Sequence, residues 1–175
     1  WVHRNYMFLQ RRLPSAWSLA FAWLDLEPVS HRRPWPTMVY QAVVVVCLRW
    51  GWRRLACAII ISFHGITRPI EATHCRRRCL IFPEDTGELA VYLHIVKPKA
   101  GRRGAREQYT TIETALECGF LQKALEPLRP EEPIFPLTPA TASCRIVKVM
   151  LVLSLPERMF TLGGLRGGGA VAHYR

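Results

Sequence analysis

Acidic residues are scarce in this sequence. Asp and Glu number 13 against 24 Lys and Arg in 175 residues, which gives a formal net charge of +11. Most of the excess is Arg, in clusters at residues 11–12, 32–33, 53–54, 76–78 and 102–103. Because the planar guanidinium suits bidentate phosphate contacts, we expect a polyanionic partner, with nucleic acid first. A surface charged only for solubility is the alternative explanation.

Long hydrophobic runs are absent as well. The two prominent apolar runs, residues 38–48 and 55–63, are shorter than the roughly 18–20 residues that span a membrane. Arg49, Arg53 and Arg54 separate them, and the first residues contain no apolar stretch typical of a signal peptide. Half of the residues are hydrophobic, so both runs predict buried core helices and no membrane partner.

Closely paired cysteines are missing too. The six cysteines form no C-x-x-C motif and no disulfide framework, which favours a reducing, intracellular compartment. We expect the nucleus if the host is eukaryotic, and otherwise the cytoplasm or nucleoid. Cys47 and Cys57 fall in the apolar runs and are expected to be buried. His74, Cys75 and Cys79 have no second ligand pair at zinc spacing, so we expect no metal and no other cofactor.

The residues that are present predict an α+β, mainly α-helical fold. Helices are expected at residues 37–50, 53–63, 113–125 and 140–153, with a short one beginning at Arg68 and Pro69 and another near Arg166. Residues 89–96 and 107–113 alternate in the manner of strands and predict a small antiparallel hairpin with a long basic loop.

Turns and boundaries follow from proline and glycine. Residues 83–88 predict a turn, and residues 127–139 a proline-rich loop. Residues 1–27 look helical and residues 28–36, which are rich in Pro and basic side chains, predict a linker. Residues 37–175 would then be the main domain, with Thr37 able to cap its first helix.

Three basic sites occur in a fixed order along the chain. Arg68 lies in "GITRPIEA", Lys97 and Lys99 lie in "HIVKPKAGRRGAREQYTTI", and Arg166 lies in "LGGLRGGGA". This order over residues 12–175 resembles the catalytic core of the tyrosine recombinases, the phage-integrase family. The family has an arginine in a first box, a lysine on a β-hairpin, and a second arginine ending a His-x-x-Arg motif. The resemblance implies that residues 1–27 end a core-binding-like region and that residues 37–175 form a truncated catalytic domain.

The resemblance also implies a chemistry, that of DNA recombination and DNA integration. In such enzymes a tyrosine attacks a DNA phosphodiester and forms a 3′-phosphotyrosine. Two arginines stabilise the extra negative charge on the non-bridging oxygens, and a hairpin lysine protonates the leaving 5′-oxygen. By resemblance, Arg68 and Arg166 would clamp the phosphate. Lys99 is our choice for the acid, and spacing does not separate it from Lys97.

Further DNA contacts are expected from the hairpin loop, namely from Lys97, Arg102, Arg103 and Arg106. The glycines at 167–169 would let the backbone and the following helix approach DNA closely. The expected partner is double-stranded DNA, together with further recombinase subunits if the family's assembly holds.

The sequence departs from the family at two points. Gly163 stands where the His-x-x-Arg motif has its histidine, and the chain ends at Arg175, before the family's nucleophilic tyrosine. Tyr174 follows Arg166 by only eight residues and suits a surface or packing role better than that of a nucleophile. We therefore expect a fragment or truncated product that binds DNA without independent strand transfer.

Less specific alternatives remain for the same residues. Arg68 could be an ordinary helix-start arginine paired with Glu71, and the loop lysines could be solvated charges. For the whole chain, the alternatives are a basic nucleic-acid-binding module without enzymatic activity and a decayed relic of a mobile element.

Overall fold

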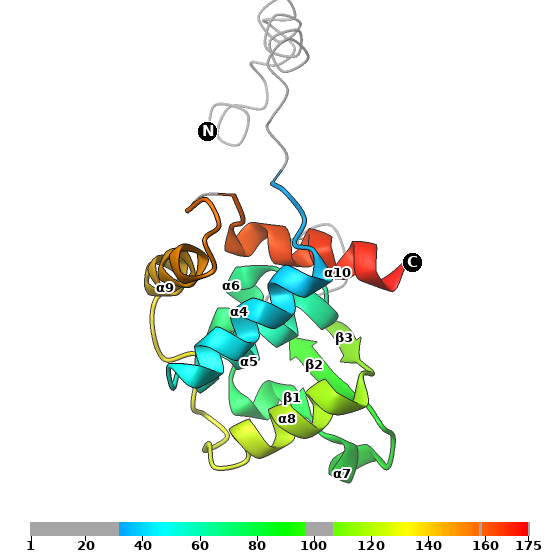
Figure 1. Cartoon of the computed structure of the whole chain (residues 1–175). Coiled ribbons are helices and arrows are strands. Elements are labelled where there is room, and N and C mark those ends of the chain that lie inside the picture. Colours follow the sequence, from blue (N-terminus) through cyan, green and yellow to red (C-terminus); the bar gives the residue numbers. More distant parts are fainter. Residues whose placement is uncertain (1–31, 97–106, 158, 175) are drawn as a thin grey trace, which may run out of the picture. The chain divides into compact units, whose positions relative to one another are not determined.

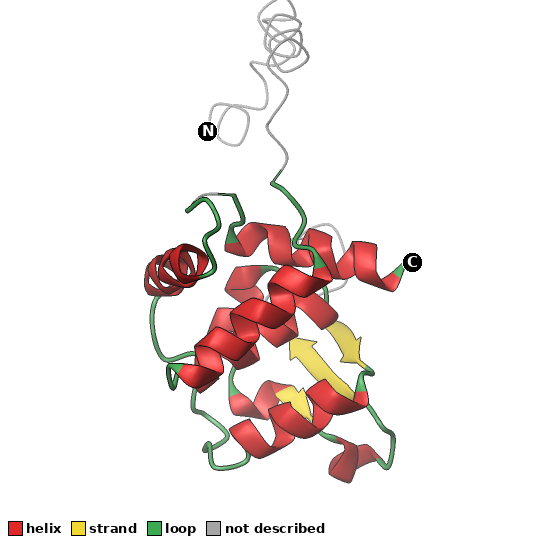
Figure 2. Ribbon diagram, viewed as in Figure 1, coloured by secondary structure: helices red, strands yellow, loops and turns green. Residues whose placement is uncertain are grey.

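The computed structural model describes residues 32–96, 107–157 and 159–174, which belong to one compact unit. The helical region expected within residues 1–27 lies outside the described residues. The unit is mainly helical with a small antiparallel sheet (Figures 1 and 2), which confirms the α+β class at this coarse level. Its elements are α4 (Thr37–Arg49), α5 (Arg53–His64), α6 (Pro69–His74), η1 (Arg77–Cys79), β1 (Leu80–Ile81), α7 (Pro83–Thr86), β2 (Val91–Ile95), β3 (Gln108–Ile112), α8 (Ala115–Leu125), α9 (Pro139–Val152), η2 (Leu162–Gly164) and α10 (Leu165–His173).

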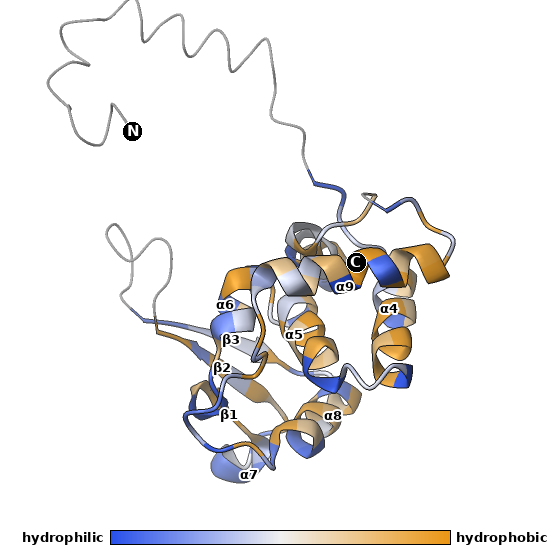
Figure 3. Cartoon of the chain, turned by 90° about the vertical axis from the view of Figure 1, so that its left-hand side faces the viewer, coloured by the Kyte–Doolittle hydropathy of each residue, from blue (hydrophilic) through white to orange (hydrophobic). Residues whose placement is uncertain are grey.

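Helix α5 is the centre of the core. Every residue from Leu55 to Phe63 is buried, and α4, α6, α8 and α10 all pack against this helix. Apolar residues recur along both α4 and α5 (Figure 3), as the two apolar runs predicted. Gly51, at φ +71°, supplies the left-handed turn that reverses the chain between the two helices. No helix in the described part of the chain has the length and apolar character needed to cross a membrane.

The sheet has three antiparallel strands in the order β1, β2, β3. Val91 pairs with Ile112 at one end of the hairpin, and Ile95 pairs with Gln108 at the other. This is the hairpin predicted from the alternating residues. Strand β1 was not predicted, because two residues are too few to show an alternation. Residues 83–88, expected as a turn, contain the single-turn helix α7.

Part of the expected linker belongs to the folded unit. Of residues 28–36, those from 32 onward are described, and Trp35 among them is 2% exposed. Its indole Nε1 donates to the carbonyl of Thr161 at 2.7 Å, and its backbone N–H donates to the carbonyl of Gly164 at 3.3 Å. The proline and arginine content predicted a linker, whereas one buried tryptophan binds this segment to the start of α10. Thr37 makes no capping hydrogen bond, since Pro36 takes the N-cap position of α4.

Of the three glycines after Arg166, Gly168 and Gly169 are buried against the protein core and do not face a DNA surface. A Cβ atom on Gly168 would lie 2.8 Å from the backbone N of Trp35 and 2.9 Å from the ring of Phe63. A Cβ atom on Gly169 would overlap the carbonyl oxygen of Phe63. The expectation that these two glycines open the backbone to DNA is therefore wrong. Their lack of side chains instead lets α10 cross α5 in direct backbone contact (Figure 1).

Replacing Gly169 with Ala should destabilise the fold, because the new methyl group meets backbone that no side-chain rotation can move. We expect Gly169→Ala to lower the free energy of unfolding by about 1–3 kcal/mol in a urea titration followed by circular dichroism. Gly119→Ala is the matched control: Gly119 lies within α8 with open space around its Cβ position. This control should raise the free energy of unfolding by about 0.5–1 kcal/mol. Equal stability of the two variants would contradict the packing described here.

The cysteines are free thiols, and five of the six are buried. Burial raises the pKa of Cys47 and of Cys57 to about 12, so these thiols stay protonated and unreactive near neutral pH. Only Cys144, on α9, is exposed.

A maleimide should therefore label the native protein at one site. We expect mass spectrometry to find one adduct, at Cys144, in the native protein and six adducts in denaturant. Cys144→Ser should carry no adduct while native. Rapid modification of Cys47 or Cys57 before unfolding would show that the core is more open than described.

Candidate nucleic-acid interface

Arg68 is the N-cap residue of α6, and it lies where α5, β3 and α6 meet. The chain leaves α5 at His64, and the hydroxyl of Thr110 on β3 donates to the carbonyl of Gly65. Ile66 then adopts a left-handed conformation, at φ 50°, and Thr67 is buried. A β-branched residue at positive φ is unfavourable, so it persists only where the surrounding contacts impose it. These contacts fix the position at which Arg68 leaves the core.

The Arg68 side chain is held by an acidic residue of its own helix. The carboxylate of Glu71 accepts from the backbone N–H of Arg68 at 2.8 Å and from its guanidinium Nη1 at 2.9 Å. The side chain of Glu71 is 9% exposed and that of Arg68 is 35% exposed. Glu71 therefore satisfies an otherwise unpaired helix N–H and orients the guanidinium. The pairing of Arg68 with Glu71, expected as an alternative to a functional role, is present. The remaining exposed donors of Arg68 are still available to a ligand.

Arg166 is the second residue of α10 and is exposed. Its helix is anchored at two points on the end of α5: Gly169 contacts Phe63, and Nε2 of His173 lies 3.1 Å from the carbonyl oxygen of His64. Arg68 follows the same end of α5 by four residues. The structure thus anchors the segments of both arginines to one place in the core.

A polar cluster that sequence reasoning did not find supports this place. The imidazole of His64 contacts the start of α8 through both ring nitrogens. Its Nε2 lies 3.4 Å from the carboxylate of Glu117, and its Nδ1 lies 3.3 Å from the hydroxyl of Thr114. Tyr40 of α4 stacks on Phe63 at 4.2 Å, and burial together with Glu117 raises the pKa of its phenol. The cluster joins α4, α5, α8 and α10. Its members are far apart in sequence, so no local pattern marks them.

Protonation of His64 is disfavoured in the folded protein. Burial lowers the pKa of His64, and His173 adds to this effect, while the carboxylate of Glu117 opposes it. At neutral pH the imidazole is therefore neutral and acts as a packing and hydrogen-bonding group at the end of α5.

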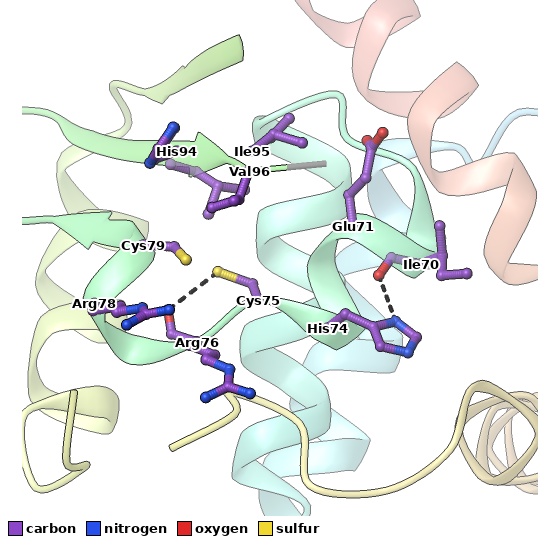
Figure 4. Close-up of a pocket in the computed structure, with 11 residues that line it drawn as sticks. Ile70, Glu71, His74, Cys75, Arg76, Arg78, Cys79, His94, Ile95 and Val96 are labelled. Atoms are coloured by element: carbon purple, nitrogen blue, oxygen red, sulfur yellow. Dashed lines mark hydrogen bonds between the residues drawn. The ribbon is translucent and has the colours of Figure 1, made fainter. Parts of the chain in front are cut away.

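Both strands of the hairpin are described, and the loop between them is not. Lys97, Lys99, Arg102, Arg103 and Arg106 lie outside the described residues, so their predicted roles stay predictions. Val96, the residue before this loop, lines a pocket of about 520 Å³ between β2 and the α6–η1 segment. Figure 4 shows Glu71, the partner of Arg68, and Ile95 and Val96 of the hairpin bordering this same pocket. The root of the hairpin and the helix of Arg68 are therefore neighbours.

The pocket also contains the thiols of Cys75 and Cys79, which face each other (Figure 4). Burial raises the pKa of Cys75, so its thiol is protonated. His74 is turned outward and its Nδ1 lies 2.9 Å from the carbonyl oxygen of Ile70. In the described ranges, no group of three or more His, Cys, Asp or Glu side chains is arranged to hold a metal ion.

Several arginines of the basic clusters contact other residues of the protein. Arg76 and Arg78 both pair with Glu131, at 2.9 and 2.7 Å. Arg77 lies over the ring of Phe82 at 4.4 Å. Arg54 pairs with Glu132 at 3.0 Å and donates to the carbonyls of Pro133 and Ile134. Arg54, Arg76 and Arg78 thereby attach the proline-rich loop to the helical core, so the number of arginines overstates the basic surface available to a partner.

No protein-family model, curated protein or solved structure matches this chain.

Removing the Glu71 carboxylate should weaken the start of α6. We expect Glu71→Ala to lower the free energy of unfolding by about 1–2 kcal/mol, since it leaves the Arg68 N–H without its acceptor. Glu71→Gln should cost less, because an amide oxygen can still accept that hydrogen bond. Thermal melts followed by circular dichroism would compare the two. A larger loss for Gln than for Ala would show that the backbone contact is not the stabilising one.

Proposed function

We propose that this chain is a duplex-DNA-binding catalytic-core fragment of a tyrosine recombinase-like protein that acts in DNA recombination or integration. In this proposal Arg68 and Arg166 contact one phosphodiester, the hairpin loop contacts the neighbouring backbone, and a hairpin lysine is the candidate general acid of a fragment that is inactive alone. The observation that carries this proposal is the anchoring of both arginine segments to the same end of α5, beside the root of the basic hairpin. The family resemblance concerned only the order of these residues along the sequence.

The positive charges of the two arginines explain how this site could stabilise a reacting phosphodiester. A phosphodiester that gains negative charge during attack is stabilised by guanidiniums already held in place, since little reorganisation is then needed. Glu71 holds Arg68, and the backbone contact between α10 and α5 holds the segment of Arg166. We assign no described tyrosine as nucleophile. Tyr40 is buried with a raised pKa, and Tyr92 is hydrogen-bonded to Glu88. Tyr109 is stacked on His94, and Tyr174 has the surface position expected from the sequence.

The second candidate is a basic nucleic-acid-binding module without enzymatic chemistry, including a decayed relic of a mobile element. The Arg68–Glu71 pair favours this reading, because it gives Arg68 a structural role. The two candidates differ in ligand preference. A phosphate clamp adapted to the duplex favours double-stranded DNA, whereas a general basic module binds single-stranded RNA equally well.

The proposed clamp predicts salt-sensitive binding that depends on both arginines. Fluorescence anisotropy with a labelled DNA duplex should show affinity falling as salt rises. We expect Arg68→Ala/Arg166→Ala to weaken binding at least tenfold, by about 1.4–3 kcal/mol, and to reduce the slope of log affinity against log salt by about two.

The matched control is Lys123→Ala/Arg129→Ala, which removes the same charge from exposed positions on α8 and the loop after it. This variant should bind within about twofold of the parent. If both double variants weaken binding alike, the effect is one of net charge and the clamp assignment fails. If the parent binds single-stranded RNA as tightly as the duplex, the second candidate is favoured.

A further inference from the structure

Residues 32–36 run beside the segment that leads into Arg166. Trp35 fixes this arrangement through its two hydrogen bonds to Thr161 and Gly164 and through its buried ring, which lies 6.1 Å from that of Phe160. The carbonyl oxygen of Arg33 lies so close to Gly164 that a Cβ atom there would overlap it. The extended segment is thus held in direct contact with η2 and the beginning of α10.

Arg32 occupies the space in front of Gly163. A Cβ atom on Gly163 would overlap Nη1 of Arg32 and would lie 2.6 Å from Cδ and 2.7 Å from Cζ of the same side chain. The guanidinium of Arg32 therefore lies where any side chain at position 163 would project. Position 163 is the one at which the family's His-x-x-Arg motif has its histidine.

Gly163 and Arg166 are three residues apart in one continuous helical segment, since η2 ends where α10 begins. Side chains at this separation lie on the same face, with Cβ atoms about 5–6 Å apart. A guanidinium over Gly163 is therefore a neighbour of the side chain of Arg166. Both arginines are exposed, and among the described residues no ion pair involves either of them.

Two neighbouring cations without an acidic partner repel each other, and a bound anion removes that repulsion. We propose that Arg32 is a third phosphate-binding arginine, which works with Arg166 on one phosphodiester and takes the place of the missing histidine. This inference rests on the proposed function and deepens it. It makes the segment before α4 part of the site. Because a guanidinium stays charged at all physiological pH values, it would hold the phosphate without titrating.

The first test compares Arg32→Ala with Arg33→Ala in the full chain. Successive residues of an extended segment point to opposite sides, so the neighbour removes the same charge without leaving Gly163 uncovered. In duplex-DNA anisotropy, Arg32→Ala should raise the Kd about tenfold and lower the salt slope by about one, and Arg33→Ala should do neither. Equal effects of the two variants, or no effect of Arg32→Ala, would overturn the inference.

A double-mutant cycle tests whether Arg32 and Arg166 share one phosphate. The loss in Arg32→Ala/Arg166→Ala should be smaller than the two single losses combined, because the second removal acts on a phosphate contact already weakened. Purely additive losses would assign the two arginines to separate phosphates and overturn the shared site.

A rescue experiment distinguishes phosphate binding from a structural role of Arg32. In Arg32→Ala/Gly163→His, the new imidazole enters the space that Arg32 leaves. Duplex binding should recover at pH 5.5–6, where the imidazole is charged, and be lost again at pH 8. Arg32→Ala alone is the control: it keeps the six histidines of the protein, lacks the new imidazole, and should show no comparable recovery. Circular dichroism verifies folding of each variant. A folded double variant with no pH-dependent recovery would contradict the proposed geometry.

The two proposals fail in different ways. If the parent binds duplex DNA and Arg32→Ala binds equally well, the role of Arg32 falls and the proposed function stands. If the parent shows no salt-dependent duplex binding, the proposed function falls, and Arg32 is still tested by titrating inorganic phosphate and following the Nε–Hε resonances of the arginines. Saturable shifts of both Arg32 and Arg166 would support a shared phosphate site. Unshifted resonances would overturn it.

Discussion

The contact between α10 and the end of α5 depends on two residues without side chains. Gly168 and Gly169 let α10 reach the backbone and ring of Phe63 and the backbone of Trp35, distances at which any other residue would collide. This contact fixes where the exposed side chain of Arg166 lies on the surface. It also covers Tyr40 and Phe63 in the core with α10. Glycine is unfavourable within a helix, so its use here indicates a close approach that the fold requires.

The C-terminal end of α5 is consequently in contact with both β3 and α10. The chain turns there into Arg68, β3 is bound to it through Thr110, and α10 is bound to it through His173. The neutral imidazole of His64 and the carboxylate of Glu117 lie beneath this point. A site formed over such a junction has rigid supports from several helices, which suits the tight geometry that phosphate recognition demands.

Charge in this protein divides into two uses. Arg54, Arg76 and Arg78 are paired with Glu131 and Glu132, so they attach the proline-rich loop to the core. Arg32 and Arg166 have no such acid among the described residues, and Gly163 leaves the space that the guanidinium of Arg32 occupies. Arg68 is intermediate, since Glu71 orients it while part of its side chain stays exposed. Arginines paired with glutamate hold the loop against the core, whereas arginines without an acidic partner favour the binding of an anion.

By itself the sequence determined the local elements. The apolar runs produced α4 and α5, Pro69 and Glu71 marked the start of α6, and the alternating residues produced the β2–β3 hairpin. Each of these signals lies within a single short window, because helix and strand periodicity are local properties. The same locality explains the misses: β1 is too short for a pattern, and the composition of residues 28–36 concealed the buried Trp35.

Only the tertiary structure decided which residues share a site. It brought Arg32 over Gly163, tied His64 to Glu117 and His173, and turned Gly168 and Gly169 toward the core. These contacts join residues separated by dozens to more than a hundred positions, so neither spacing nor composition carries them. The physical reason is that close packing and charge pairing act through space, and the chain's path through space is set by the whole core at once.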